Sequence, residues 1–207
     1  MPIYYFDFDD TLFPTSWLIS WVKDLTHPIE LSEAVKAALA QYSKILYELI
    51  SYCTTHGRMI IVTNAEARWV QEMMERYLPQ ISLTDVVVYS AADYVREKLP
   101  DTPYQRWKLV MFRQLLPNNP EESIYCAGDC SNDLDCFWEA VLETKIRYHA
   151  MHAARFMEHP LLFQLKRSLL QLLVDLKNPP STHHYVEYRY HWDPTASNKD
   201  QRSLPIT

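Results

Sequence analysis

Two short clusters of aspartates are the residues of this chain best suited to chemistry. The clusters are Asp7-Phe8-Asp9-Asp10-Thr11 and Gly128-Asp129-Cys130-Ser131-Asn132-Asp133. Asp7 and Asp9 are alternate residues, so on a strand both side chains would point to one face. Crowded carboxylates repel one another, and a bound cation relieves the repulsion. Because a site built from a few carboxylate oxygens suits Mg²⁺, the two clusters together predict a magnesium site.

Two other positions offer groups that a bound phosphate would need. Thr63 and Asn64 follow the apolar run at 58–62 and provide a hydroxyl and backbone amides. Lys108, near the start of a predicted helix, provides a compact positive charge. Beside a metal, one carboxylate could attack phosphorus while another protonates the leaving oxygen. The combination predicts phosphoryl transfer.

The hydrophobic pattern alternates between short apolar runs and helical periodicity. It predicts strands at 3–8, 58–62, 85–89, 123–127 and 144–149, and helices at 16–26, 31–54, 65–77, 105–116, 132–141 and 160–177. This order is typical of a three-layer, Rossmann-like α/β fold, in which a parallel sheet of about five strands carries helices on both faces. Such sheets bind ligands at the carboxyl ends of their strands, and the aspartate clusters and the Thr63-Asn64 pair each follow a predicted strand.

The four signals, in this order along the chain, resemble motifs one to four of the haloacid dehalogenase (HAD) superfamily. The matching segments are DFDDT, VTN, the lysine and GDCSND, and the resemblance covers roughly residues 3–150. It implies a magnesium-dependent phosphate monoester hydrolase that forms an aspartyl-phosphate intermediate. In that scheme Asp7 is the nucleophile and a metal ligand. Asp9 is the general acid and base and offers its backbone carbonyl to the metal, and Asp129 is the third ligand.

The resemblance also assigns the supporting residues. Asp133 corresponds to the residue that supports the metal shell, and Thr63 and the amide of Asn64 correspond to phosphate binders. Lys108 corresponds to the motif-three lysine, because it starts a helix that leads into a predicted strand. Lys98, beside a Leu-Pro loop, is the alternative for that role.

Two residues of the first cluster have less defined roles. Thr11 is either a supporting hydrogen-bond partner or a turn residue, and Asp10 is expected to be a loop aspartate without a catalytic role. Two other functions stay open, namely a phosphotransferase with the same chemistry and a catalytically silent HAD-like binding module. Silent modules usually lack residues of the Asp7 or Asp9 type, and this chain has both.

The expected organisation is a catalytic domain at 1–177 with a small helical cap insert at about 13–56. Residues 178–207, which follow the last predicted helix and contain two consecutive prolines, are expected to be a dispensable C-terminal tail. The alternative is that the aromatic run at 185–192 packs on the core or on a second subunit.

A small cap would leave the site open to an accessible phosphate monoester. The phosphorylated partner would be a small molecule or a macromolecular end, such as a nucleotide or nucleic acid. Trp17, Trp21, Arg68 and Trp69 are expected near the rim, where they could stack on a base or grip a second phosphate. The net charge of −6 argues weakly against nucleic acid as the substrate. The alternative that a second subunit closes the site is kept.

Composition argues against several other classes. The chain has only two glycines, which excludes glycine-rich phosphate loops, and its four cysteines form no C-x-x-C pair of the zinc-ribbon kind. No apolar stretch is long enough to span a membrane, and the acidic N-terminus is unlike a signal peptide. By default, a cytoplasmic protein with free thiols is expected.

Overall fold

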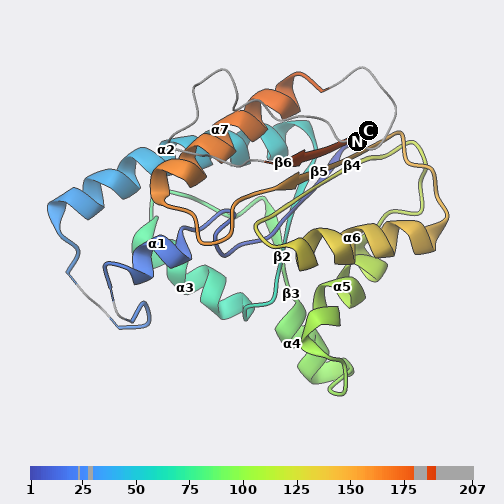
Figure 1. Cartoon of the computed structure of the whole chain (residues 1–207), viewed down its shortest axis with the longest axis horizontal. Helices are drawn as coiled ribbons and strands as arrows, with labels where there is room; N and C mark the ends of the chain where they lie inside the picture. The colour runs from blue at the N-terminus through green and yellow to red at the C-terminus, as the bar shows by residue number, and fades with distance from the viewer. Residues whose placement is uncertain (23, 28–29, 180–185, 190–207) are drawn as a thin grey trace.

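The centre of the molecule is a parallel sheet of six strands in the order β3-β2-β1-β4-β5-β6 (Figure 1). The structure is a computed structural model and describes residues 1–22, 24–27, 30–179 and 186–189. The strands are β1 (Ile3–Phe6), β2 (Arg58–Thr63), β3 (Val86–Ser90), β4 (Ser123–Gly128), β5 (Ala150–Arg155) and β6 (Val186–Arg189). Each neighbouring pair is parallel, so the predicted fold class is confirmed.

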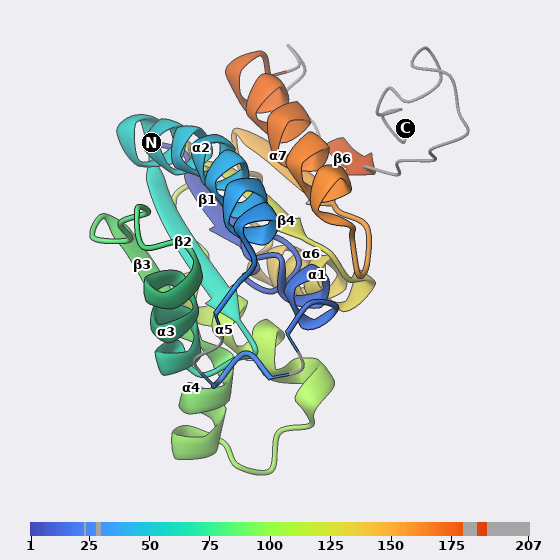
Figure 2. The same cartoon turned by 90° about the vertical axis from the view of Figure 1, so that its left-hand side faces the viewer.

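Helices cover both faces of this sheet (Figure 2). They are α1 (Thr15–Ile19), α2 (Glu33–His56), α3 (Ala67–Tyr77), α4 (Ala91–Lys98), the 3₁₀ helix η1 (Tyr104–Arg106), α5 (Trp107–Leu115), α6 (Ser131–Thr144) and α7 (Leu162–Lys177). Helices α2, α3 and α7 share one hydrophobic cluster, and α4, α5 and α6 contribute to the other. The sheet with one group of helices packed on each face gives the molecule three layers.

Strand β1 lies in the middle because both of its faces are apolar. Tyr4 and Phe6 are buried in the first cluster, while Ile3 and Tyr5 are buried in the second. Alternate side chains of a strand point to opposite faces, so a strand without polar residues needs cover on both sides. The strand therefore delivers Asp7, the residue that follows it, to the centre of one sheet edge.

Strand β5 lies later in the sequence than predicted. It spans residues 150–155, whereas the prediction was 144–149. Helix α6 continues to Thr144, and Lys145 ends it in the left-handed conformation with φ 56°. A chain that has just left a helix this way needs a few residues to reach the sheet, and that displaces the strand.

Helix α4 was not predicted. It starts directly after β3, where the Ser90 hydroxyl accepts a hydrogen bond from the Asp93 backbone amide at 2.9 Å. This N-cap, together with the buried residues Ala91, Ala92 and Val95, stabilises a helix of only two turns.

The tail predicted at 178–207 contains the sixth strand. Residues 186–189 pair in parallel with residues 152–155 of β5. With this strand the sheet has one strand more than the predicted number of about five. It was missed because a short segment after two prolines carries no periodic signal. The rest of the aromatic run and the end of the tail lie outside the described residues, so the dispensability of the tail stays a prediction.

The insert predicted as a cap at about 13–56 is largely part of the core. The long helix α2 packs against α7 and β2, and its buried residues recur at helical spacing, as in Leu39, Tyr42, Leu46 and Leu49. That apolar stripe needs the sheet as its partner, so the helix cannot stand over the site. Of the described residues of this insert, α1 and the residues at 20–22, 24–27 and 30–32 are left to act as a cap.

None of the described helices is both long enough and apolar enough to cross a membrane.

Stability should depend on pH through His152 on β5. Burial lowers the pKa of this imidazole from 6.5 to about 4, and its ring stacks on Tyr125 at 4.7 Å between centroids. The folded protein therefore resists protonation that the unfolded chain accepts. Its free energy of unfolding is unaffected by this group above pH 6.5. It falls by up to about 1.4 kcal/mol per pH unit between pH 6.5 and 4.

Urea unfolding of the wild type and of His152→Phe, at several pH values from 7.5 to 4.5, measures this effect. The difference in free energy of unfolding between wild type and His152→Phe should change as the pH falls below 6.5. The control His56→Gln, at an exposed residue, should follow the wild type. Parallel curves for wild type and His152→Phe would contradict the expectation.

Candidate active site

Three strands deliver polar residues to one edge of the sheet. Asp7 follows β1, Thr63 ends β2 and Asp129 follows β4, and the Asp7 amide donates to the Ala127 carbonyl at 2.8 Å. A cavity of about 350 Å³ opens at this edge. It is lined by Asp7, Asp9, Asp10, Thr63, Asn64, Ala65, Tyr104, Lys108, Asp129, Cys130 and Asp133. The fold thus brings together all the predicted site residues except Thr11.

Lys108 lies at the centre of this group. Its side chain is only 3% exposed, and Nζ donates to Asp7 Oδ1 at 2.5 Å and to Asp133 Oδ1 at 2.6 Å. Lys98, at the end of α4, is exposed and pairs with Glu97. Of the two lysines considered from the sequence, only Lys108 lines the cavity that contains the aspartates.

The site has more carboxylates than ammonium groups. Burial would lower the pKa of Lys108, but Asp7 and Asp133 raise it above its ordinary value. Burial raises the pKa of Asp7 well above its ordinary value, although Lys108 opposes this. Burial, followed by the nearby Asp133, raises the pKa of Asp129 to about 7. A single ammonium leaves this group short of positive charge.

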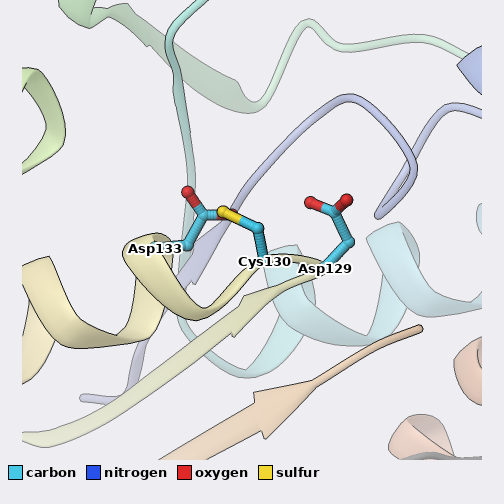
Figure 3. Close-up of side chains that lie close together, drawn as sticks. All are labelled: Asp129, Cys130 and Asp133. Carbon is cyan, nitrogen blue, oxygen red and sulfur yellow. The ribbon is translucent and has the colours of Figure 1, made fainter. Parts of the chain in front are cut away.

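The unbalanced carboxylates fit a divalent cation. Atoms of Asp129, Cys130 and Asp133 that could bind a metal lie within 4.8 Å of one another, and Figure 3 shows these side chains at the junction of β4 and α6. Among the described residues, the buried Asp133 Oδ2 and Asn64 Oδ1 have no hydrogen-bond partner. Oxygen donors without protein partners suit a hard cation such as Mg²⁺, which would make little use of the Cys130 sulfur.

Gly128 makes room for Asp133. A Cβ atom at this position would lie 2.7 Å from Asp133 Oδ2 and 2.8 Å from Asp133 Cβ. Since the Asp133 carboxylate also accepts the Lys108 hydrogen bond, a shift of its side chain would disturb the whole cluster.

Gly128→Ala is therefore expected to lower turnover of a phosphate ester at least about tenfold, and stability by about 1–3 kcal/mol. The control Gly57→Ala should also destabilise, because its Cβ would meet the Pro2 carbonyl oxygen at 2.3 Å. Gly57 precedes β2, at the end of that strand away from Thr63 and the cavity, so turnover per folded molecule should match the wild type. Equal turnover per folded molecule in the two variants would contradict this role of Gly128.

Asp10 and Thr63 make structural contacts, whereas the buried Thr11 hydroxyl has no hydrogen-bond partner among the described residues. Asp10 has φ 54°, and its carboxylate accepts from the Ser16 amide at 2.8 Å and from the Ser16 hydroxyl at 2.5 Å, so it ties the loop to α1. Thr11 is buried away from the cavity, and Thr63 Oγ1 accepts from the Ala65 amide at 3.0 Å. The arrangement agrees with a loop role for Asp10, and among the described residues it gives the Thr11 hydroxyl no supporting hydrogen bond.

Sequence reasoning missed Thr15 and Tyr104 and placed Trp69 only near the rim of the site. Asp9 Oδ1 accepts from the Thr15 hydroxyl at 2.5 Å and from Trp69 Nε1 at 3.2 Å. Tyr104, which is 56% exposed, lines the cavity next to Trp107. Threonine and tyrosine are common, and Thr15 and Tyr104 carry no motif that would have singled them out.

Comparison with known proteins gives a likeness of fold. No protein-family model matches the sequence, and no curated protein is significantly similar to it. A crystal structure of the Legionella pneumophila effector Ceg4, with an N-terminal yeast Hog1p sequence, is similar with a TM-score of 0.52 and 13% identity. The match covers 86% of this chain and 96% of that chain.

The HAD domain of the Legionella pneumophila effector Lem4 is a weaker neighbour. Its TM-score is 0.46 at 13% identity, over 84% of this chain and 94% of that chain. The Ceg4 comparison supports the α/β architecture over most of both chains.

Proposed function

We propose that this protein is a HAD-type, magnesium-dependent phosphate monoester hydrolase with Asp7 as its nucleophile. The observation that carries the proposal is the contact of Lys108 with Asp7 and Asp133 inside a cavity that Asp9, Thr63 and Asp129 also line. A buried carboxylate beside a fixed positive charge and phosphate-binding groups is the arrangement that phosphoryl transfer needs.

The residues divide the reaction into two steps. An Asp7 oxygen attacks phosphorus, the bond from phosphorus to the ester oxygen breaks, and Asp9 gives a proton to the leaving alkoxide. Asp9 then takes a proton from water as the water oxygen attacks phosphorus, which releases inorganic phosphate and restores Asp7. Lys108 orients Asp7 and balances charge, while the Thr63 hydroxyl and the Asn64 amide bind phosphoryl oxygens.

The donor set also defines the proposed cation site. Asp7, the Asp9 backbone carbonyl and Asp129 would hold Mg²⁺, with Asp133 in support. When bound, the ion supplies positive charge to the phosphoryl oxygens.

Hydrolysis of an aryl phosphate, with and without Mg²⁺, tests this proposal. Turnover should require Mg²⁺, stop with a chelator and fall in Ca²⁺, whose looser and higher coordination would misplace the attacking carboxylate. Mg²⁺ should also raise the melting temperature in the absence of substrate. Turnover that is unaffected by a chelator, or the absence of any hydrolysis with a broad set of esters, would overturn the proposal.

The substrate is proposed to be an accessible phosphate monoester. Support comes from the insert at 13–56, since α2 belongs to the core and, of the other described residues of the insert, α1 and a short connection are left to shade the cavity. A competition among aryl phosphates, mononucleotides, phosphorylated oligonucleotides, sugar phosphates and phosphopeptides tests this. A preference of roughly a thousandfold for one small sugar phosphate would contradict an open site. Transfer of the phosphoryl group to an added alcohol, instead of to water, would indicate a phosphotransferase.

A further inference from the structure

We propose that Trp69 and Thr15 are positioning residues that hold the Asp9 carboxyl group for proton transfer. The inference rests on the proposed function and extends it to two residues outside the four motifs. Both contacts reach the same atom, because Thr15 Oγ1 lies 2.5 Å and Trp69 Nε1 lies 3.2 Å from Asp9 Oδ1.

Two donors on one oxygen determine which oxygen can carry the proton. Asp9 Oδ1 uses its acceptor capacity on the hydroxyl and the indole N–H. In the residues described here, no hydrogen bond reaches Asp9 Oδ2 from another side chain or amide. The transferable proton therefore belongs on Oδ2, and rotation of the carboxyl group would break both contacts. The exchange of a proton with the leaving oxygen, and later with water, needs such a fixed direction.

The fold supplies these donors from separate segments. Thr15 is the first residue of α1, in the segment left as a cap, and Trp69 lies in the first turn of α3. The indole is half-buried against the main hydrophobic cluster, which restricts its orientation. A bridge between Asp9 and Phe13 holds the intervening loop. The acid is thus supported on one side by the core and on the other by the cap segment.

The leaving group distinguishes positioning from a general structural role. 2,4-Dinitrophenolate leaves without a proton, whereas an alkoxide needs one. For Trp69→Phe, which keeps a ring but removes the N–H, kcat/KM should fall about tenfold or more for an alkyl phosphate and less than about twofold for 2,4-dinitrophenyl phosphate. The ratio kcat/KM is used because it reports the first phosphoryl transfer, before the dephosphorylation step that both esters share.

Thr15 provides an independent pair of variants. Thr15→Val should show the same selective loss as Trp69→Phe, and Thr15→Ser, which keeps a hydroxyl, should restore the alkyl phosphate activity. This pair decides the matter if Trp69→Phe does not fold. Trp138→Phe changes a half-buried indole on α6 and should leave the ratio of the two kcat/KM values unchanged. Equal losses for both esters, or none, in Trp69→Phe and Thr15→Val would overturn the proposal.

The contact can also be observed without turnover. In ¹H–¹⁵N spectra, the indole N–H resonance of Trp69, assigned by its loss in Trp69→Phe, should shift in Asp9→Ala, while that of Trp138 should stay. An unchanged Trp69 resonance would refute the contact itself. If the wild type hydrolysed neither ester, the proposed function would fail, and the spectrum would still report on the contact.

Discussion

Replacement of Asp7 by asparagine should lower turnover of an aryl phosphate by on the order of 10⁴-fold. The amide has nearly the same shape but cannot form the acyl phosphate, so the two-step path is lost. Asn can still accept the Lys108 hydrogen bond that Asp7 accepts at 2.5 Å, and the cluster should stay intact. Steady-state rates with saturating Mg²⁺ measure the loss, and acid-quenched samples of the wild type should contain protein-bound phosphate.

The matched control is Asp135→Asn on the exposed face of α6, which removes a carboxylate of the same charge near the same motif. It should keep wild-type turnover, and both variants should retain the circular dichroism of the wild type. If Asp7→Asn turned over the ester at the wild-type rate, or trapped as much phosphate as the wild type, Asp7 would not be the nucleophile.

Lys108→Ala should damage both turnover and stability. The side chain is 3% exposed and pairs with the buried Asp7 and Asp133, so its removal leaves carboxylates without their ammonium partner. Breaking a buried ion pair in this way costs about 3–5 kcal/mol, and loss of charge at the phosphoryl group should reduce kcat about 10²–10³-fold. Urea unfolding without metal and steady-state kinetics measure the two effects separately.

Lys98→Ala is the comparison, because Lys98 is exposed and its ammonium pairs with the neighbouring Glu97. Turnover and stability of this variant should match the wild type. The sequence alone suggests that both lysines lie at the surface and that both variants keep their stability. The surface position is wrong for Lys108, whose side chain is buried on α5, and its burial is the reason to expect a loss of stability. Equal effects of the two substitutions on turnover, or the reverse order, would exclude Lys108 from the phosphate site.

The sequence by itself determined the features that depend on neighbouring residues. The continuous apolar run of residues 3–6 specifies a strand buried on both faces, and the helical stripe of 39–49 specifies the long helix α2 on one side of the sheet. Because parallel strands share a carboxyl edge, Asp7, Thr63 and Asp129 could be expected to meet there, and the structure brings them to one cavity. Their catalytic roles stay proposals that the variants above test.

Tertiary structure alone decided the features that depend on residues far apart in the chain. Helix α2 belongs to the core because α7, more than a hundred residues later, packs beside it, and this reduces the cap to a short segment. Strand β6 exists only as a partner of β5. The contact of Trp69 with Asp9 joins residues 60 positions apart, and the contact of Lys108 with Asp7 joins residues 101 positions apart. Periodicity reports which face of an element is apolar, whereas packing determines which polar group that element meets.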